Sequence, residues 1–282
     1  MKATPVQHQV TLRDGVRLAL NVWAGPDGSR GTVVIAHGLG EHANRYLELA
    51  GDLVGDGWEV HASDHRGHGR SPGPRGVVPK PETIRDDMIE LLHYARATGP
   101  SPIVLLGHSM GGAFAAWAVA HDPTAADALI LSSPALLAKM SGLQRVMMHT
   151  MLRLSPDLVI GNGLDVRFIS RDQRVVTAYR EDPLVHDRVS ARLASGIVTA
   201  GERARAQAAH WKTPTLLLYA GADRLVNPRG SEVFAAAAPS SVVTTHRFDA
   251  LYHELFNEPE RKAPVTAMTQ WLRDLPAALR RR

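Results

Sequence analysis

The sequence predicts a fold of the α/β class, in which a mostly parallel central sheet is flanked by helices and a helical cap is inserted after the sixth strand. Short apolar runs suited to buried strands alternate with longer segments of helical pattern along the 282 residues, as in βαβ units. One gap between strand-like runs, residues 135–210, is much longer than an ordinary crossover and has helical but no convincing strand pattern. We therefore expect one domain over residues 1–282, with residues 135–210 forming the cap.

The first predicted element is a hairpin. Residues 6–12 and 16–24 alternate between polar and apolar positions around a turn at Asp14-Gly15. The other strand-like runs are residues 31–38, 58–65, 101–109, 126–134, 213–221 and 241–249. Helical patterns separate most of these runs, at residues 43–54, 82–97, 110–121, 230–238 and 259–274. Helical connections of this kind place successive strands parallel in one sheet.

The composition restricts the class of protein. Apolar residues make up 44% of the chain, no run approaches the ~18 apolar residues of a membrane span, and the first residues lack the apolar stretch of a secretory signal. The absence of cysteine excludes disulfides, thiolate metal sites and a cysteine nucleophile. A net charge of +4, from 32 Lys and Arg against 28 Asp and Glu, is too small and dispersed for nucleic-acid binding. We expect a cytoplasmic protein, and the sequence does not indicate its oligomeric state.

The segment LLGHSMGGAF places a serine between a strand and a helix. The apolar residues 103–106 suit a buried strand, and the Ala-rich residues 110–120 suit a buried helix. Gly107 and Gly111 flank the sharpest point, where a Cβ atom would crowd the neighbouring backbone. A GxSxG pattern in this strand-turn-helix setting predicts a nucleophile elbow with Ser109 as the nucleophile.

A serine nucleophile needs a base within hydrogen-bond reach and an acid that orients the base. In chains with this elbow, the acid and then the histidine follow the serine. Asp223 is the first acid after the strand-like run at 213–221 and lies where a parallel strand opens into the ligand crevice, although its role could instead be to cap that turn. Only His246 and His253 follow it. His246 falls in a strand pattern and His253 in a loop, so we predict a triad of Ser109, Asp223 and His253.

The tetrahedral intermediate of acyl transfer needs two N–H donors for its oxyanion. Gly38 and Gly40 surround Leu39 after the strand at 31–38, which frees the backbone N–H of Leu39 to point into the site. The second donor is the N–H of Met110, because the residue after the nucleophile contributes one. We predict that Leu39 and Met110 form the oxyanion hole.

No metal and no cofactor are expected. Several histidines cluster near glycines and suggest metal binding at first sight, namely His37, His42, His65, His68 and His108. No HExxH or comparable ligand spacing accompanies them. Hydrogen bonding within turns explains these histidines better than a metal site.

An apolar stripe lies at the start of the predicted cap. Its members recur at spacings of three and four and would share one helix face: Leu136, Met140, Leu143, Met147, Met151 and Leu154. Methionine is flexible and polarizable, which suits a surface that accepts variable acyl chains. We therefore assign Met140, Leu143, Met147 and Met151 to an acyl tunnel, with plain packing of the cap on the sheet as the equal alternative.

The chain resembles the α/β-hydrolase superfamily, and more narrowly the branch of bacterial monoacylglycerol lipases and lysophospholipases. The resemblance covers nearly the whole chain and is carried by HGLGEHANRY (37–46), DHRGHGRSPG (64–73), GHSMGG (107–112), SRDQRVVTAYREDPLVH (170–186), GADRLV (221–226) and YHELFNEPER (252–261). The elbow marks only the superfamily, whereas the segments at 170–186 and 252–261 resemble the monoglyceride lipase branch in particular. The chain departs from the family in FDALYHE, which replaces a Pro-Gly often seen before the histidine loop.

The resemblance implies a serine hydrolase that cleaves carboxylic esters of medium or long acyl chains, with monoacylglycerols as the expected substrates and no cofactor. It also implies the same triad and oxyanion donors, with a cap that forms an apolar acyl tunnel. A lysophospholipase or a broad carboxylesterase on the same machinery is the nearest alternative. A ligand-binding homologue without catalysis is an alternative of a different class. The expected partner is a small lipid ester, and peripheral contact of the cap with a membrane or micelle is left open.

Overall fold

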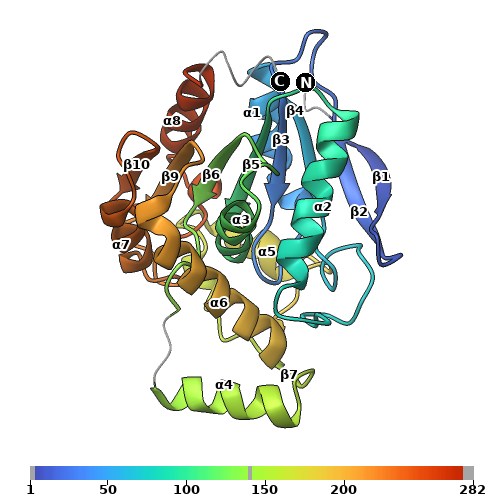
Figure 1. Cartoon of the computed structure of the whole chain (residues 1–282), viewed down its shortest axis with the longest axis vertical. Coiled ribbons are helices and arrows are strands. Elements are labelled where there is room, and N and C mark those ends of the chain that lie inside the picture. Colours follow the sequence, from blue (N-terminus) through green and yellow to red (C-terminus); the bar gives the residue numbers. More distant parts are fainter. Residues whose placement is uncertain (1–3, 139–141, 276–282) are drawn as a thin grey trace.

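A computed structural model describes residues 4–138 and 142–275. An eight-stranded sheet runs through the centre of the molecule (Figure 1). In chain order its strands are β1 (Val6–Thr11), β2 (Arg17–Trp23), β3 (Thr32–Ala36), β4 (Glu59–Ser63), β5 (Ile103–His108), β6 (Ala128–Ser132), β9 (Thr215–Ala220) and β10 (Val243–Phe248). Across the sheet their order is β1-β2-β4-β3-β5-β6-β9-β10.

The strand directions bring several loops to one edge of the sheet. The β1–β2 and β2–β4 pairs are antiparallel, and all pairs from β4 to β10 are parallel. In the parallel part, Ala36 pairs with Gly107, and Ser132 pairs with His108 on one side and Leu218 on the other. The strands therefore end at nearly the same level, and the loops that follow them meet at the edge where α/β sheets bind ligands.

Helices cover both faces of the sheet, because β3, β5, β6 and β9 are buried along their whole length and expose no polar face. One face is covered by α2 (Thr83–Thr98), α3 (Met110–His121), α6 (Ala191–Gln207) and α7 (Arg229–Ala237), which share one core cluster with the strands. The other face is covered by α1 (Leu47–Gly55) and α8 (Lys262–Arg273). The predicted parallel sheet between two helical layers is confirmed.

The insertion between β6 and β9 contains α4 (Gly142–Leu154), β7 (Val159–Gly161), the 3₁₀ helix η2 (Val166–Phe168), α5 (Gln173–Glu181), β8 (Arg188–Ser190) and α6. The prediction of no strand in this segment is wrong, because β7 and β8 form a two-stranded antiparallel sheet. Three residues per strand are too few to produce a recognisable alternation in sequence.

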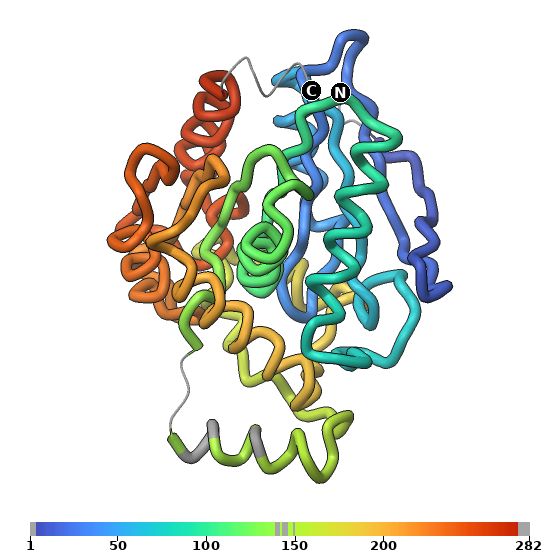
Figure 2. Tube along the Cα trace, viewed as in Figure 1, coloured from blue at the N-terminus to red at the C-terminus, as the bar shows by residue number. Residues whose placement is uncertain are grey.

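The parts of the insertion lie at different distances from the sheet. The helix α6 packs along α3 and belongs to the layer that covers the sheet. The helix α4 contacts α6 and lies on its far side, away from the sheet (Figures 1 and 2). Residues 135–210 therefore contain a helix of the main body as well as elements that lie above it.

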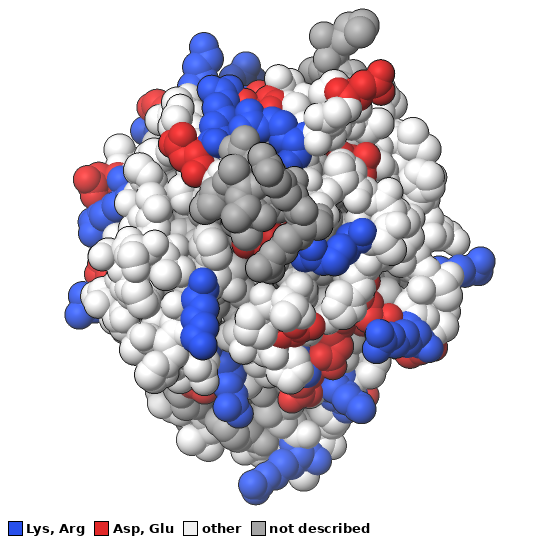
Figure 3. All heavy atoms as spheres, turned by 45° about the horizontal axis from the view of Figure 1, so that its top comes forward, with Lys and Arg blue, Asp and Glu red and all other residues white. Residues whose placement is uncertain are grey.

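The surface is of mixed charge. Figure 3 shows Lys and Arg interspersed with Asp and Glu over the face it displays, with a small group of basic side chains near the top of the view. In the described ranges, none of the helices combines the length and the apolar composition that crossing a bilayer requires.

Candidate active site

Ser109 occupies the tight turn between β5 and α3. Its backbone has a φ of 53° and a ψ of −119°, a region that is strained for a residue with a Cβ atom. The turn is held by hydrogen bonds: the Ser109 N–H donates to the carbonyl of Ser132 at 3.0 Å, and the Ser109 carbonyl accepts the N–H of Ala135 at 2.9 Å. The side chain is partly exposed. Backbone strain at an accessible serine is what a nucleophile elbow requires.

The two glycines of the GxSxG pattern are required by close packing. A Cβ atom on Gly107 would lie 2.6 Å from the carbonyl oxygen of Gly111 and 2.7 Å from Cβ of Ala115. A Cβ atom on Gly111 would collide with the carbonyl oxygens of Ala36 and His37 at the end of β3. Helix α3 can therefore approach β3 and β5 closely only because both positions are glycine.

The structure brings Asp223 and His253 together. Asp223 follows β9, and its Oδ2 atom lies 2.7 Å from Nδ1 of His253. Its Oδ1 atom accepts the N–H groups of Leu225 and Val226 at 2.8 and 2.9 Å. Asp223 thus fills both roles considered from the sequence, since one oxygen caps the turn and the other holds the histidine. The alternative base, His246, is exposed on β10.

The Asp223–His253 pair is buried, with exposed fractions of 8% and 5%. Burial by itself lowers the pKa of His253, but the charge of Asp223 and the hydrogen bond to it outweigh burial, and the net shift is upward from 6.5. Burial likewise raises the pKa of Asp223, while the charge of His253 and its hydrogen bond lower it, and the net shift is downward. The pair therefore favours a carboxylate beside an imidazolium, which is the state that a general base passes through.

The loop after β3 lies against the elbow. A Cβ atom built on Gly38 would lie 3.3 Å from Cβ of Ser109. The N–H of Gly38 donates to Oε1 of Glu41 at 2.5 Å. Gly40 has a φ of +78°, and its carbonyl accepts the N–H of His186, in the insertion, at 2.9 Å. The loop is thus fixed between the sheet and the insertion.

The predicted oxyanion donors lie in these two segments. Leu39 belongs to the loop after β3, and its side chain packs half-buried against the main core. Met110 is the first residue of α3, and its side chain is buried. Met110 thus follows Ser109 in the chain, and Leu39 follows Gly38, which lies against Ser109; the roles of both as donors stay a prediction.

A buried ionic network behind the triad was not anticipated from the sequence. Arg45 donates to Glu41 at 2.6 Å and to both carboxylate oxygens of Glu254 at 2.6 and 2.8 Å. The hydroxyl of Tyr46 donates to Glu41 at 2.7 Å, and the ring of Tyr179 in α5 lies 4.6 Å from the guanidinium carbon of Arg45. The network joins the loop that carries Gly38 to the residue after His253. Its only signal in the sequence is its place inside HGLGEHANRY and YHELFNEPER.

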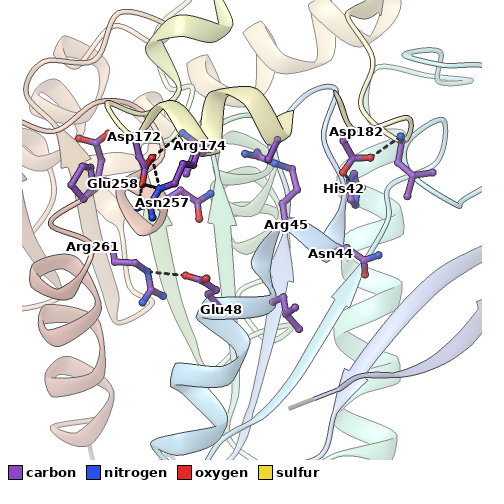
Figure 4. A pocket seen from close by; sticks show the side chains of 15 residues that line it. His42, Asn44, Arg45, Glu48, Asp172, Arg174, Asp182, Asn257, Glu258 and Arg261 are labelled. Atoms are coloured by element: carbon purple, nitrogen blue, oxygen red, sulfur yellow. Dashed lines mark hydrogen bonds and ion pairs between the residues drawn. The ribbon is translucent and has the colours of Figure 1, made fainter. Parts of the chain in front are cut away.

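A polar cavity of about 630 Å³ opens beside this network, between α1, α5 and the loop that follows His253. Figure 4 shows His42, Arg45, Glu48, Asp182 and Glu258 around it. His42 Nε2 and Asp182 Oδ2 are 2.8 Å apart on one side. Seven of its fifteen lining residues are Asp, Glu or Arg, so the cavity suits an acyl chain poorly.

The predicted apolar stripe does not form one helix face. Leu136 precedes α4 and is fully buried in the main core, Met140 lies outside the described residues, and of Leu143 only its place in α4 is described. Met147 exposes 53% of its surface, whereas its neighbour Met148 exposes 7% and Met151 is half-buried. A spacing of three and four cannot decide which of two adjacent methionines faces inward. The acyl-tunnel assignment of Met140, Leu143, Met147 and Met151 therefore stays a prediction.

The clustered histidines hydrogen-bond mainly between segments that lie far apart in the chain, and the expected bonding within turns holds only for His37 with Gly38 and for His68 with Arg66. Nδ1 of His37 lies 2.8 Å from the carbonyl oxygen of Gly38, and Nε2 of His37 accepts the N–H of His65 at 3.0 Å. Nδ1 of His108 lies 3.1 Å from the carbonyl oxygen of Ser132, and its ring centroid is 4.7 Å from that of His253. Burial lowers the pKa of His37 and of His108 to about 4, so both rings are neutral at neutral pH.

Comparison with known proteins places this geometry in a family. Residues 27–260 match a family model described as serine aminopeptidase, S33. The chain is 35% identical over 277 residues to a monoacylglycerol lipase of Mycolicibacterium smegmatis, covering 96% of this chain and 98% of that protein. A phospholipase of Bacillus subtilis is 30% identical, with 82% of this chain and 90% of that protein covered. The crystal structure of a Paleococcus ferrophilus monoacylglycerol lipase is similar with a TM-score of 0.83 and 34% identity, covering 90% of this chain and 98% of that chain.

Proposed function

Because the chain belongs to the serine aminopeptidase S33 family of α/β-hydrolases, we propose that it is a serine ester hydrolase and that its substrates are monoacylglycerols. The observation that carries the proposal is the strained turn at Ser109 at the same sheet edge as the buried Asp223–His253 pair. The monoacylglycerol lipases that match nearly the whole chain in sequence and in fold support the substrate class. The predicted resemblance to that branch is confirmed.

In the proposed mechanism, Ser109 attacks the ester carbonyl and His253 takes the proton from its hydroxyl group. Asp223 holds the imidazole in the tautomer with the proton on Nδ1 and stabilises the imidazolium that forms. The N–H groups of Leu39 and Met110 stabilise the oxyanion. His253 then protonates the leaving alcohol, and water hydrolyses the acyl-enzyme by the same steps in reverse order.

The second candidate function is a lysophospholipase, which the similarity to a phospholipase of Bacillus subtilis favours. The two activities share the acyl chain and the ester and differ in the leaving alcohol, which is glycerol in one case and a charged glycerophosphate derivative in the other. The triad alone cannot distinguish them, because it contacts only the ester. A comparison of substrates with the same acyl chain is therefore needed.

We further propose that the insertion contacts lipid surfaces. Its outer part exposes large apolar side chains on and after α4: Val146 at 63%, Met147 at 53%, Leu154 at 78%, Leu158 at 53% and Ile160 at 49%. Substrates of this class sit in membranes and micelles, so such a surface would lower the free energy of extraction of the acyl chain. The half-buried Met151, on the same helix, would meet the chain as it enters.

The proposal is tested with a substrate panel. A monoacylglycerol, a lysophospholipid of the same acyl chain and a short p-nitrophenyl ester are compared by kcat/KM, with Ser109→Ala as the control. We expect the monoacylglycerol to be the best of the lipid substrates and the alanine variant to lose a factor on the order of 10⁶ in turnover. A better rate on the lysophospholipid would favour the second candidate. Hydrolysis by Ser109→Ala within about tenfold of wild type would refute the serine mechanism.

A further inference from the structure

The loop that carries His253 is closed by a buried carboxylate. Glu258 exposes 2% of its surface, and its side chain none. Its Oε1 atom accepts the N–H of Arg171 at 2.5 Å, and its Oε2 atom accepts Nε of Arg171 at 2.6 Å and the N–H of Tyr252 at 3.2 Å. A charge buried this completely is tolerated only while its donors stay in place, so these three bonds are strongly coupled to the local structure.

The donors to Glu258 come from the histidine loop and from the insertion. Tyr252 precedes His253, and Glu258 follows the 3₁₀ helix η4 (Leu255–Asn257). The carboxylate therefore bonds to the residue before His253 and ends the loop after it, while Arg171 belongs to the insertion. Glu258 lies beside Asp172, just before α5, as Figure 4 shows. One side chain thus fixes both ends of the histidine loop to the insertion.

Two further hydrogen bonds join the same two segments of the chain. The N–H of Glu254 donates to the carbonyl of Ile169 at 2.8 Å, and the hydroxyl of Ser170 donates to the carbonyl of Asn257 at 2.8 Å. Residues 169–171 are thus bonded along the length of residues 252–258. We call this pair of segments the brace.

The brace also reaches the loop that carries Asp223. The guanidinium carbon of Arg224, the next residue, lies 4.6 Å from the ring centroid of Phe168 and 5.9 Å from that of Tyr252. The rings of Phe168 and Tyr252 meet edge to face, with centroids 5.9 Å apart. The insertion therefore contacts the neighbours in sequence of both members of the Asp223–His253 pair.

We propose that Glu258 is a positioning residue, which holds the His253 loop against the insertion so that the imidazole stays in line with Asp223 and Ser109. The inference rests on the proposed function, because it assigns a role in the same reaction. Glu258 lies outside the triad and acts through Tyr252. Displacement of a general base by about 1 Å costs up to roughly a hundredfold in rate, so a loosened loop has a measurable effect.

The chain supplies a matched control. Arg171 also pairs with Glu260, whose side chain is 56% exposed and makes no described bond to the histidine loop. Glu258→Gln and Glu260→Gln each neutralise one carboxylate partner of the same arginine. N–H donors bond to both oxygens of Glu258. In Glu258→Gln the new NH₂ group therefore faces an N–H donor whichever oxygen it replaces, which is not so for Glu260→Gln.

The experiment measures kcat, KM and the pH dependence of kcat/KM for wild type and both variants on a soluble ester, with active enzyme counted by fluorophosphonate titration. For Glu258→Gln we expect kcat per titrated site to fall roughly ten- to hundredfold with KM little changed. We also expect the acidic limb of kcat/KM to move to lower pH, because the raised pKa of His253 depends on its contact with Asp223. Glu260→Gln should stay within about twofold of wild type.

The outcomes are separable. If Glu258→Gln lowers only the fraction of titratable enzyme and leaves kcat per site and the acidic limb unchanged, Glu258 is merely structural and the proposal is overturned. If wild type itself reacts with no fluorophosphonate, the proposed function fails instead. Should Glu258→Gln not fold, Ser170→Ala removes one bond of the brace, and its kcat per site should fall about two- to fivefold. A wild-type value for Ser170→Ala would then overturn the proposal.

Discussion

Two parts of the insertion differ in how they contact the rest of the molecule. The segment from η2 through α5 is packed down, with Ile169, Val176 and Tyr179 exposing 4%, 1% and 8% of their surface, and it is hydrogen-bonded to the histidine loop. Helix α4 instead exposes Met147 by 53% and Leu154 by 78%. Both lie in one excursion of the chain between β6 and β9.

The difference teaches that the insertion combines two tasks. The packed segment belongs to the scaffold that holds the triad, so changes there should act on kcat and on stability. The exposed helix α4 belongs to the surface that we propose meets lipid, so changes there should act on substrates with long acyl chains and leave the fold intact. The predictions below test this division, starting with the largest expected effect.

Among the changes that compare these regions, the largest loss is expected at the Asp223–His253 pair, whose histidine loop is hydrogen-bonded to the packed segment. Asp223→Asn should keep the fold but lower kcat by roughly 10⁴, because an amide in place of the carboxylate favours the wrong tautomer of His253. The control is Asp187→Asn, a carboxylate of the insertion that is 73% exposed and should change kcat by no more than about twofold. Steady-state kinetics on a soluble ester measures both. Equal losses would show that the effect at Asp223 does not come from its contact with His253.

The next largest expected difference is in the free energy of unfolding, which should fall for a truncation in the packed segment and hardly change for one in α4. Ile169→Ala truncates a side chain packed between the insertion and its neighbours and should lower the free energy of unfolding by about 2–5 kcal/mol. Leu154→Ala truncates an exposed side chain of α4 and should change the free energy of unfolding by no more than about 0.5 kcal/mol. Denaturant titration compares the two. A large loss for Leu154→Ala would show that α4 has a packing partner in solution.

The role of α4 should show in how kcat/KM depends on the length of the substrate's acyl chain. Each buried methylene of an acyl chain contributes ~0.8 kcal/mol, or roughly fourfold in kcat/KM, until the apolar surface is filled. Met147→Glu should flatten this increase and leave acetyl esters unaffected, while Met147→Leu retains it. Since Met147 is half exposed, the melting temperature should hardly change. If Met147→Glu lowers kcat/KM alike for all chain lengths, α4 has no role in the binding of the acyl chain.

The smallest effect is a shift along the pH axis. His253 must be neutral to accept a proton, and its pKa is raised above 6.5 by Asp223 against the opposing effect of burial. Activity should therefore fall as the pH decreases through a midpoint above 6.5. The pH profile of kcat/KM on a soluble ester reports this midpoint for the free enzyme. A midpoint below 6.5 would mean that burial prevails over the contact with Asp223.

The sequence predicts the main body of the fold because its signals are local and strong. Fully apolar runs such as residues 103–106 can only be buried, and the glycines around Ser109 permit one packing of α3 against the strands. Strands of three residues and a helix with apolar side chains on more than one face give no such signal. This is why the sequence does not predict β7 and β8, and why the predicted stripe includes Leu136, which lies before the start of α4.

In the candidate site, chain order led to Asp223 and to two histidines, and the strand pattern around His246 left His253 as the base. The structure places Oδ2 of Asp223 2.7 Å from Nδ1 of His253. The charged residues that support them, Arg45 and Glu258, could not be found in this way. A charged side chain in a loop is ordinarily exposed, and its burial depends on partners far along the chain, such as Arg171 for Glu258. Only the assembled structure brings these partners together.

The central claim, that Ser109 is the nucleophile of an ester hydrolase, is tested most directly by covalent labelling. The chain is reacted with a fluorophosphonate, the number of adducts is counted by intact mass, and the modified residue is located by peptide mapping, while ester hydrolysis is followed in parallel. The account predicts one adduct per chain, on Ser109, and loss of hydrolysis in proportion to labelling. An adduct on another residue, or hydrolysis that survives complete labelling, would contradict it.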